Sequence, residues 1–280
     1  MRPSLKNLLA LMLAAAIGSQ VAGAIPVLTG FDTASLGKCD DKSSGAVALG
    51  FTANFFGRSY TSVFVNNNGN VTFDSVLSAY TPFDLAATHR AMIAPFFADV
   101  DTRGAASGVA SFGTGVFGGH DAFGVTWDGV GYYGFGTDKL NRFQLVLVSR
   151  SDLAPGDFDI YFNYEQMQWE SGNASGGRAG LGGFAARAGY SNGDPNTSYE
   201  LAGSAQRGAL VDGGRTSLVA GSNIGQAGRY LFEIRNGVAA VPDTGSTATL
   251  TALVCGALWR ARRHLAGEDK PVSTPSDLRA

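Results

Sequence analysis

Two neighbouring segments with a period of two constrain the fold of this chain more than any other feature. Residues 141–150 and 158–166 carry large apolar or aromatic side chains at alternate positions. In a β-strand, this period places those side chains on one face. The connecting residues contain Pro155-Gly156, a typical turn pair. The sequence therefore predicts an antiparallel hairpin with one buried face.

Two further segments indicate strands. Residues 60–73 (YTSVFVNNNGNVTF) place β-branched and aromatic residues on both sides of an Asn/Gly-rich turn at 66–70, which predicts a second hairpin. Residues 91–100 form a nearly continuous apolar run of strand length, in which Pro95 indicates a bulge or a sheet edge. These segments add three strands to the first hairpin.

Glycine and phenylalanine are frequent, with 39 and 18 of the 280 residues. Many glycines suit short strands and tight turns better than helices, because an interior Gly costs a helix about 1 kcal/mol relative to Ala. Segments 123–127 and 230–234 predict two more strands, and 235–240 a linker. The best helix candidate, Phe83–Arg90, is a turn or two long. The predicted fold class is all-β, with an antiparallel sandwich-like architecture.

Residues 1–24 are typical of a secretory signal peptide. Arg2 and Lys6 give the positive start, residues 8–17 form the apolar region, and the final Ala-Gly-Ala supplies the small residues that signal peptidase needs. A buried N-terminal helix is the alternative. We expect an exported chain that begins at Ile25 after cleavage.

Residues 241–264 combine a short motif, an apolar stretch that ends at Trp259, and a basic cluster. By the positive-inside rule, the apolar helix enters the bilayer and the arginines stay cytoplasmic. This predicts a single C-terminal membrane segment, although residues 245–259 give only about 22 Å of helix for a core of about 30 Å. The motif residues are Val241, Pro242, Asp243, Thr244, Gly245, Ser246 and Thr247, and the membrane stop consists of Arg260, Arg262 and Arg263.

This order of features resembles the PEP-CTERM class of bacterial sorting signals, in the variant that begins Val-Pro-Asp-Ser-Gly-Ser-Thr. Six of the seven residues match, with Thr244 in the serine position. The resemblance implies processing by an exosortase, a membrane-embedded enzyme of Gram-negative bacteria. The polar tail at 265–280 departs from the family, whose members usually stop after the basic cluster. The alternatives are a sortase signal (Leu-Pro-x-Thr-Gly, matched at 241–245 except in its first residue) and a plain tail anchor.

Between the two ends lies a domain of residues 25–240, in which several motifs occur in a fixed order. They are FTANFFGRSY (51–60), VNNNGNVTF (65–73), MIAPFFADVDTR (92–103), the strand around Trp127, NRFQLVLV (141–148), Gln168-Trp169 and AGLGGFAARAGYSNG (179–193). This pattern resembles the nidogen-like extracellular domain, NIDO, of nidogen, tectorin and mucin-type surface proteins. The resemblance implies an extracellular, non-enzymatic module of matrix and adhesion proteins.

Together these resemblances predict an exported bacterial protein of the cell surface or matrix, with an adhesive or biofilm-structural role. The expected partners are signal peptidase, an exosortase-like enzyme, the membrane through the C-terminal segment, and exopolysaccharide or matrix proteins.

A net charge of −2 and a pI of about 5.9 argue against a nucleic-acid binder, which usually carries a basic face.

Catalytic motifs are weak in this sequence. Three His and two Cys leave little material for a zinc site or a disulfide framework. Gly113, Gly115 and Gly118 spell GxGxxG without a helical pattern after them, which predicts loop glycines rather than a dinucleotide site. His89 and His120 lie in loop-like sequence, which gives no indication of a Ser-His-acid triad. We expect no enzyme; the alternative is a carbohydrate-active or other enzyme on an all-β scaffold.

Asp99 and Asp101 form the one constellation that could hold a cofactor. Two carboxylates one strand-step apart suit a hard cation such as Ca²⁺, to which the loop at 66–70 could add oxygen ligands. In the alternative, both carboxylates cap a strand end and bind backbone amides or Arg103. Both interpretations place a polar centre at the end of the apolar run at 91–100.

Overall fold

The computed structural model describes residues 27–239. The predicted signal peptide and the C-terminal signal lie outside the described residues. Every strand pairing within the described range is antiparallel, and the strands form two large sheets and one two-stranded ribbon. The predicted all-β, sandwich-like class is confirmed.

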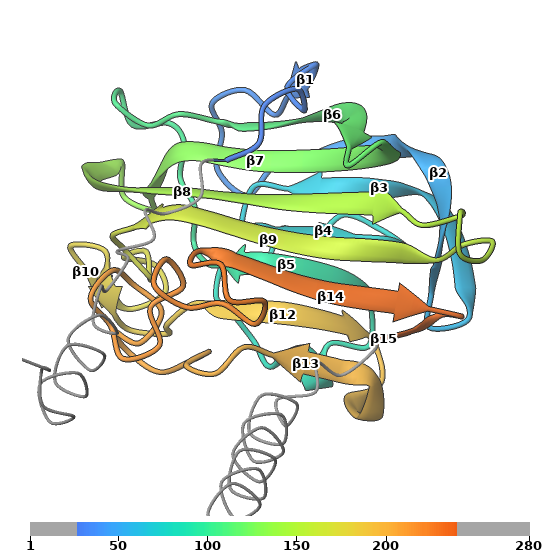
Figure 1. Ribbon diagram of the computed structural model, residues 1–280. Helices are drawn as coiled ribbons and strands as arrows, with labels where there is room; N and C mark the ends of the chain where they lie inside the picture. Colours follow the sequence, from blue (N-terminus) through green and yellow to red (C-terminus); the bar gives the residue numbers. More distant parts are fainter. Residues whose placement is uncertain (1–26, 240–280) are drawn as a thin grey trace, which may run out of the picture. The chain divides into compact units, whose positions relative to one another are not determined.

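The first sheet has seven strands in the order β1-β6-β7-β8-β9-β14-β15 (Figure 1). Their bounds are β1 Ala34–Ser35, β6 Ala110–Phe117, β7 His120–Tyr132, β8 Gly136–Ser149, β9 Phe158–Met167, β14 Arg229–Arg235 and β15 Val238–Ala239. The predicted hairpin is β8–β9, with Leu145 opposite Phe162 and Leu147 opposite Ile160. Period-two patterning thus gave the correct pairing partners at the centre of this sheet.

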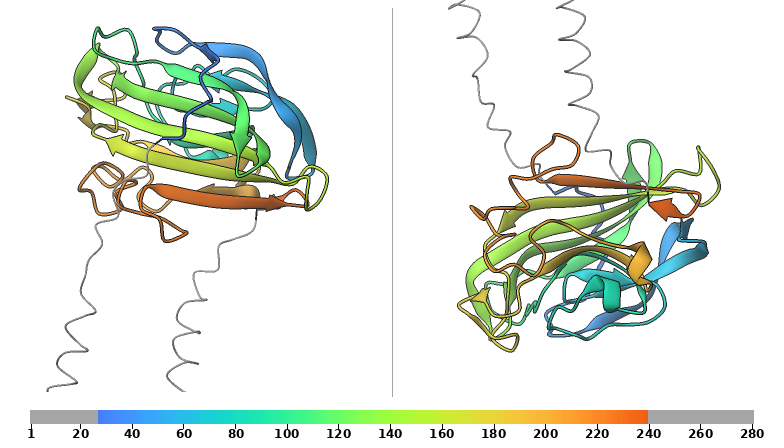
Figure 2. Two further views of the ribbon diagram at one scale, coloured as in Figure 1. Left: turned by 45° about the horizontal axis from the view of Figure 1, so that its top comes forward. Right: turned by 90° about the horizontal axis from the view of Figure 1, so that it is seen from below.

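The second sheet has six strands in the order β13-β12-β5-β4-β3-β2 and lies against the first, as two views show (Figures 1 and 2). Its strands are β13 Ser198–Glu200, β12 Arg187–Asn192, β5 Ala91–Phe97, β4 Asn70–Thr72, β3 Arg58–Asn66 and β2 Ser43–Phe55. The ribbon consists of β10 Gly177–Arg178 and β11 Leu181–Gly182, and two single 3₁₀ turns are η1 Leu85–Ala87 and η2 Pro195–Thr197. The second predicted hairpin is β3–β4.

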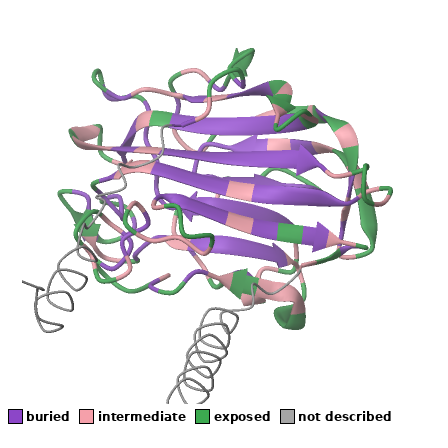
Figure 3. Cartoon of the chain, viewed as in Figure 1, coloured by how far each residue is buried: buried purple, intermediate pink, exposed green. Residues whose placement is uncertain are grey.

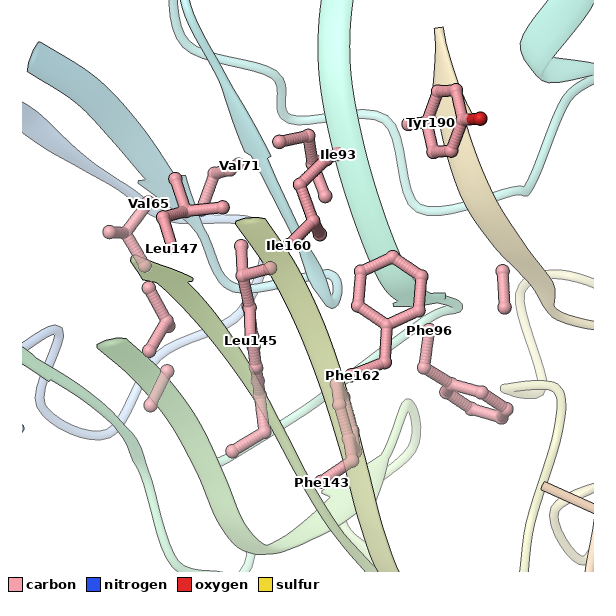
Figure 4. Packing of buried hydrophobic residues seen from close by; sticks show 14 of the residues in the cluster. Val65, Val71, Ile93, Phe96, Phe143, Leu145, Leu147, Ile160, Phe162 and Tyr190 are labelled. Carbon is pink, nitrogen blue, oxygen red and sulfur yellow. The ribbon is translucent and has the colours of Figure 1, made fainter. Parts of the chain in front are cut away.

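Aliphatic and aromatic side chains from both sheets fill the space between them. Val65, Val71 and Ile93 of the second sheet meet Leu145 and Ile160 of the first (Figure 4). All five side chains are fully buried. Burying a side chain of this kind contributes about 1.5–3 kcal/mol, so the two apolar faces hold the sheets together.

The outer face of the first sheet is also partly covered, which the alternating pattern did not indicate. Phe31 packs there with Ala122, Val146 and Val148 in a separate small cluster. A Cβ at Gly124 would lie 2.4 Å from the Phe31 ring, so this close approach requires glycine. Figure 3 shows that the central strands are accordingly buried along most of their length.

Of the two alternatives for Pro95 the bulge is confirmed, and the predicted linker at 235–240 needs correction. Pro95 lies in β5, which is an interior strand between β12 and β4, so Pro95 is not at a sheet edge. The register between β5 and β12 shifts across Pro95, as a bulge requires. The predicted linker 235–240 begins with a tight hairpin, because β15 pairs back onto β14. Within residues 27–239, no helix is long and apolar enough to cross a membrane.

Candidate functional site

A polar centre lies where the chain leaves β5. The strand ends at Phe97, before the end of the predicted run, and the following residues pair irregularly with the segment around Cys39. The Thr102 amide donates to the Cys39 carbonyl at 3.0 Å, and the Cys39 amide donates to Thr102 Oγ1 at 2.7 Å. Asp40 and Asp101 form an isolated antiparallel bridge. These contacts bring the acidic residues at 40–41 beside those at 99–101.

The turn of the β3–β4 hairpin forms the other wall of this centre. Asn67 and Asn68 are almost completely buried. The Asn68 side chain accepts from the Val100 amide at 2.9 Å and donates to Asp41 Oδ1 at 2.7 Å. Asn67 Nδ2 donates to the Val100 carbonyl at 2.6 Å. These hydrogen bonds fix the turn at residues 66–70, here called the asparagine turn, against the chain that follows β5. The bond from Asn68 also holds the Asp41 side chain in place.

Asp40, Asp41 and Asp99 come together at this centre. One ligand atom from each of the three lies within 4.8 Å of the others. Asp41 has a left-handed backbone, with φ of 55°, which aspartate tolerates better than most residues. Asp99 is completely buried, and Asp40 is partly buried. Three carboxylates thus share a small, poorly hydrated space.

Burial shifts the acidity of this cluster. Burial is the main reason that the pKa of Asp99 is raised to about 7. The negative charges of Asp41 and Asp40 raise this pKa further, whereas the hydrogen bond from Ser175 lowers it. Burial also raises the pKa of Asp40 to about 6, helped by Asp41 and Asp101 and opposed by Arg103. Because like charges and desolvation both disfavour the ionised form, these carboxylates raise the free energy of the folded state when all are charged.

Asp101 is held differently, although it is also completely buried. Its Oδ1 accepts from the Arg103 amide and Nε at 2.9 Å, and its Oδ2 accepts from Arg103 Nη2 at 2.8 Å and from the Phe135 amide at 3.3 Å. Burial acts to raise the pKa of Asp101, but the Arg103 and Phe135 hydrogen bonds outweigh it and hold the pKa below its usual value. This is the contact with Arg103 and backbone amides that the capping interpretation expected for Asp101.

Replacing Arg103 by glutamine is expected to reduce the free energy of unfolding by about 2 kcal/mol. Removing one partner of a buried ion pair leaves the other charge uncompensated, and the partial exposure of Arg103 moderates the usual loss of about 3–5 kcal/mol. Arg103→Lys keeps the positive charge but not the bidentate contact with Asp101, so a smaller loss of the free energy of unfolding is expected. Urea denaturation of the full chain measures both. Equal stability of all three proteins would contradict the importance of this pair.

The sequence-predicted pair is therefore split between two environments. Asp99 belongs to the three-carboxylate cluster, while all oxygens of Asp101 are engaged by Arg103 and Phe135. Asp40 and Asp41 were not expected from the sequence, because no spacing rule connects them with a residue far along the chain. Their adjacency in Cys39-Asp40-Asp41 is the only local sign of the cluster.

The other sequence motifs lie elsewhere. Gly113 and Gly115 are inside strand β6 rather than in a loop, and Gly118 forms the turn to β7, so the GxGxxG spacing lies on a β-hairpin. His120 begins β7 with its Nδ1 3.6 Å from Asp152. His89 follows η1 with φ of 49°. The sorting motif Val241–Thr247 and the arginines that follow it lie outside the described residues.

An open pocket of about 400 Å³ lies beside β13 and β14. Its lining includes Tyr199, Tyr230 and Arg215, together with small residues of the loop at 201–223. None of the described residues that line it is a carboxylate or a histidine. This composition suits shape-based contact better than acid–base chemistry.

Comparisons with known proteins find relatives that are similar in sequence. Alpha-tectorin of Mus musculus and that of Homo sapiens are each 34% identical over 234 residues, which cover 75% of this chain and 10% of the tectorin. Nidogen of Drosophila melanogaster is 27% identical over 235 residues, covering 73% of this chain and 16% of the nidogen. This chain therefore matches only about a tenth to a sixth of the length of these relatives. No solved structure matches it.

A family model described as the nidogen-like domain, NIDO, matches residues 61–236. The match begins in β3 and ends just after β14, and so includes the asparagine turn, β5 with the acidic residues after it, and the β8–β9 hairpin. These are among the segments that carried the resemblance in the sequence, whereas FTANFFGRSY (51–60) lies just before the match. The chain therefore belongs to the nidogen-like (NIDO) domain family.

Proposed function

We propose that this protein is exported and serves as a non-enzymatic structural or adhesive component of a bacterial surface or extracellular matrix. The observation that carries the proposal is the NIDO match over 61–236, which covers most of the described domain. Parts of alpha-tectorin and of nidogen are similar in sequence to this chain. An extracellular, structural module is the role that the family resemblance implies.

Features of the chain outside the NIDO match support export. Residues 1–24 have the charge, apolar stretch and small final residues of a signal peptide. The lining of the pocket beside β13 and β14, with tyrosines and one arginine, supports a contact role rather than hydrolysis. Because the match covers so little of tectorin or nidogen, a partner for this domain is sought among exopolysaccharides and matrix proteins rather than carried over from those proteins.

The C-terminal motif completes the proposal. Residues 241–247, the apolar stretch and the three arginines act as a sorting signal that an exosortase of a Gram-negative host reads after export. Pro242 restricts its own φ and Gly245 allows the backbone to turn, so the motif can be presented in an extended form before the membrane segment. Arginines are costly in the bilayer core and hold the segment at a fixed depth.

The double variant Pro242→Ala/Asp243→Ala is expected to leave the domain folded, while an unprocessed, membrane-retained form accumulates. Replacing Arg260, Arg262 and Arg263 by Gln is instead expected to let the segment pass through the membrane, so that unprocessed protein is secreted. Blots of membrane and medium fractions, from hosts with and without the exosortase, measure both outcomes.

The exported protein is expected to begin at Ile25, which N-terminal sequencing measures.

Each alternative gives a distinct result. Processing of the Pro242/Asp243 variant at the parent's rate would make the motif a linker and leave a plain tail anchor. Processing that continues without the exosortase but requires a sortase would assign the motif to the sortase class. Material that still begins at Met1 would contradict export.

A further inference from the structure

The three carboxylates at the polar centre are each held by one protein donor. Arg103 Nη2 lies 2.9 Å from Asp40 Oδ2, Asn68 Nδ2 donates to Asp41 Oδ1 at 2.7 Å, and Ser175 Oγ donates to Asp99 Oδ2 at 3.2 Å. The donors come from three separate segments. They fix one oxygen of each carboxylate.

The second oxygens of Asp40 and Asp99 are not satisfied by the protein. Both Oδ1 atoms are buried and have no hydrogen-bond partner among the residues that the structure describes. Asp99 is completely buried as a residue. Buried polar atoms in native proteins nearly always have a partner, and a buried carboxylate oxygen without one is costly. Two such oxygens in one cluster can be compensated either by protonation of the carboxyl groups or by a bound cation.

The charges point the same way. Arg103 is the only cation in direct contact with the described carboxylates of this centre, and its Nη2 lies 2.8 Å from Asp101 Oδ2 and 2.9 Å from Asp40 Oδ2. Arg103 supplies one positive charge to four carboxylates, so Asp40, Asp41, Asp99 and Asp101 carry a surplus of negative charge when all are ionised. A buried surplus of this size requires either protons or a metal ion.

We propose that Asp40, Asp41 and Asp99 bind one Ca²⁺ ion. Ca²⁺ lies about 2.3–2.6 Å from its oxygen ligands, so two ligands of one ion are at most about 5 Å apart. The three carboxylate atoms, all within 4.8 Å of one another, meet this limit. Water and backbone carbonyls complete the six to eight oxygens that the ion requires. Asp101 is not a ligand, because Arg103 and the Phe135 amide occupy both of its oxygens.

The ion would join two parts of the chain that are distant in sequence. Asp40 and Asp41 precede β2 of the second sheet, and Asp99 follows β5 of the same sheet. Bound Ca²⁺ would therefore fasten the entry segment of the domain to the chain that leaves β5. This gives the acidic end of the MIAPFFADVDTR motif a role in stability.

Calcium titration of the full chain in a mild detergent, after removal of metals with EDTA, tests the proposal. The melting temperature is expected to rise by about 5–10 °C at a hundredfold excess of CaCl₂ over the dissociation constant. Calorimetry is expected to give one site per chain. An equal response to MgCl₂ would overturn the assignment to Ca²⁺, and no response to either salt would overturn the site.

Asparagine variants separate metal binding from a purely structural role. Asp99→Asn and Asp41→Asn are each expected to weaken Ca²⁺ binding about tenfold or more, because affinity depends on the number of charged ligands. In EDTA, Asp99→Asn is expected to melt no lower than the parent, since it removes one of three repelling carboxylates. The control Asp101→Asn is expected to keep the calcium response. Loss of that response in Asp101→Asn, with retention in Asp41→Asn, would favour the Asp99/Asp101 pair and overturn the proposal.

Discussion

Replacing Gly69 by alanine is expected to prevent the domain from folding. Gly69 lies in the asparagine turn with φ of +75°, and a Cβ built there would lie 1.7 Å from the Phe96 carbonyl oxygen. The two backbones are hydrogen-bonded here, with the Phe96 amide donating to the Gly69 carbonyl at 3.2 Å. Relief of the clash would require the turn to move away from β5. The expected loss exceeds about 4 kcal/mol, a large part of the 5–15 kcal/mol of a typical domain.

Gly57→Ala is the matched control for this variant. Gly57 has a similar φ of +82°, but no atom lies within 4 Å of its would-be Cβ. Its replacement therefore measures the backbone cost alone, about 1 kcal/mol. Far-ultraviolet circular dichroism and resistance to proteolysis of the full chain compare the two variants. If Gly69→Ala is no less stable than Gly57→Ala, the close approach of the turn to β5 is not required.

The strands were predictable where local periodicity is strong. In the β8–β9 hairpin, alternate residues face the core, and a register error of one residue would turn every apolar side chain outward. The asparagine turn was recognised because Asn and Gly tolerate positive φ. Its burial was not recognised, since burial depends on β5 and Trp127, which come from other parts of the sequence.

The covered outer face of the first sheet shows the same limit. Val146 and Val148 sit at alternate positions that a half-exposed strand would leave to water, yet Phe31 covers them. Leu28 also exchanges hydrogen bonds with the Gln144 side chain, at 3.1 and 2.7 Å. Strand periodicity identifies two faces but gives no information about a distant segment that packs on the second one.

The acidic centre could be predicted only in part. The sequence predicted a polar site at the end of the run at 91–100, with Asp99 in it. The same-face expectation for Asp99 and Asp101 assumed that the strand continues through both residues, whereas β5 ends at Phe97. The chain then bends and pairs with Asp40, so that Asp101 turns to Arg103 while Asp99 lies with Asp40 and Asp41.

Replacing Trp127 by alanine is expected to reduce the free energy of unfolding by about 3–5 kcal/mol. The indole is fully buried and stacks on Phe143 with ring centres 5.0 Å apart, so alanine would leave a large cavity. Its Nε1 also donates to the Asn67 carbonyl at 2.9 Å, and alanine would leave that buried acceptor unpaired.

Trp127→Phe separates the two contributions of the indole. Phenylalanine keeps the aromatic contact with Phe143 and loses the hydrogen bond to the asparagine turn, so a loss of about 1–3 kcal/mol is expected. Trp169→Phe is a matched comparison, because Trp169 is equally buried and its Nε1 donates to the Val130 carbonyl at 2.9 Å, away from the turn. Urea denaturation measures all three variants. Equal losses for Trp127→Ala and Trp127→Phe would show that Trp127 stabilises the domain mainly by holding the asparagine turn; a much larger loss for alanine, as expected, assigns most of its effect to packing between the sheets.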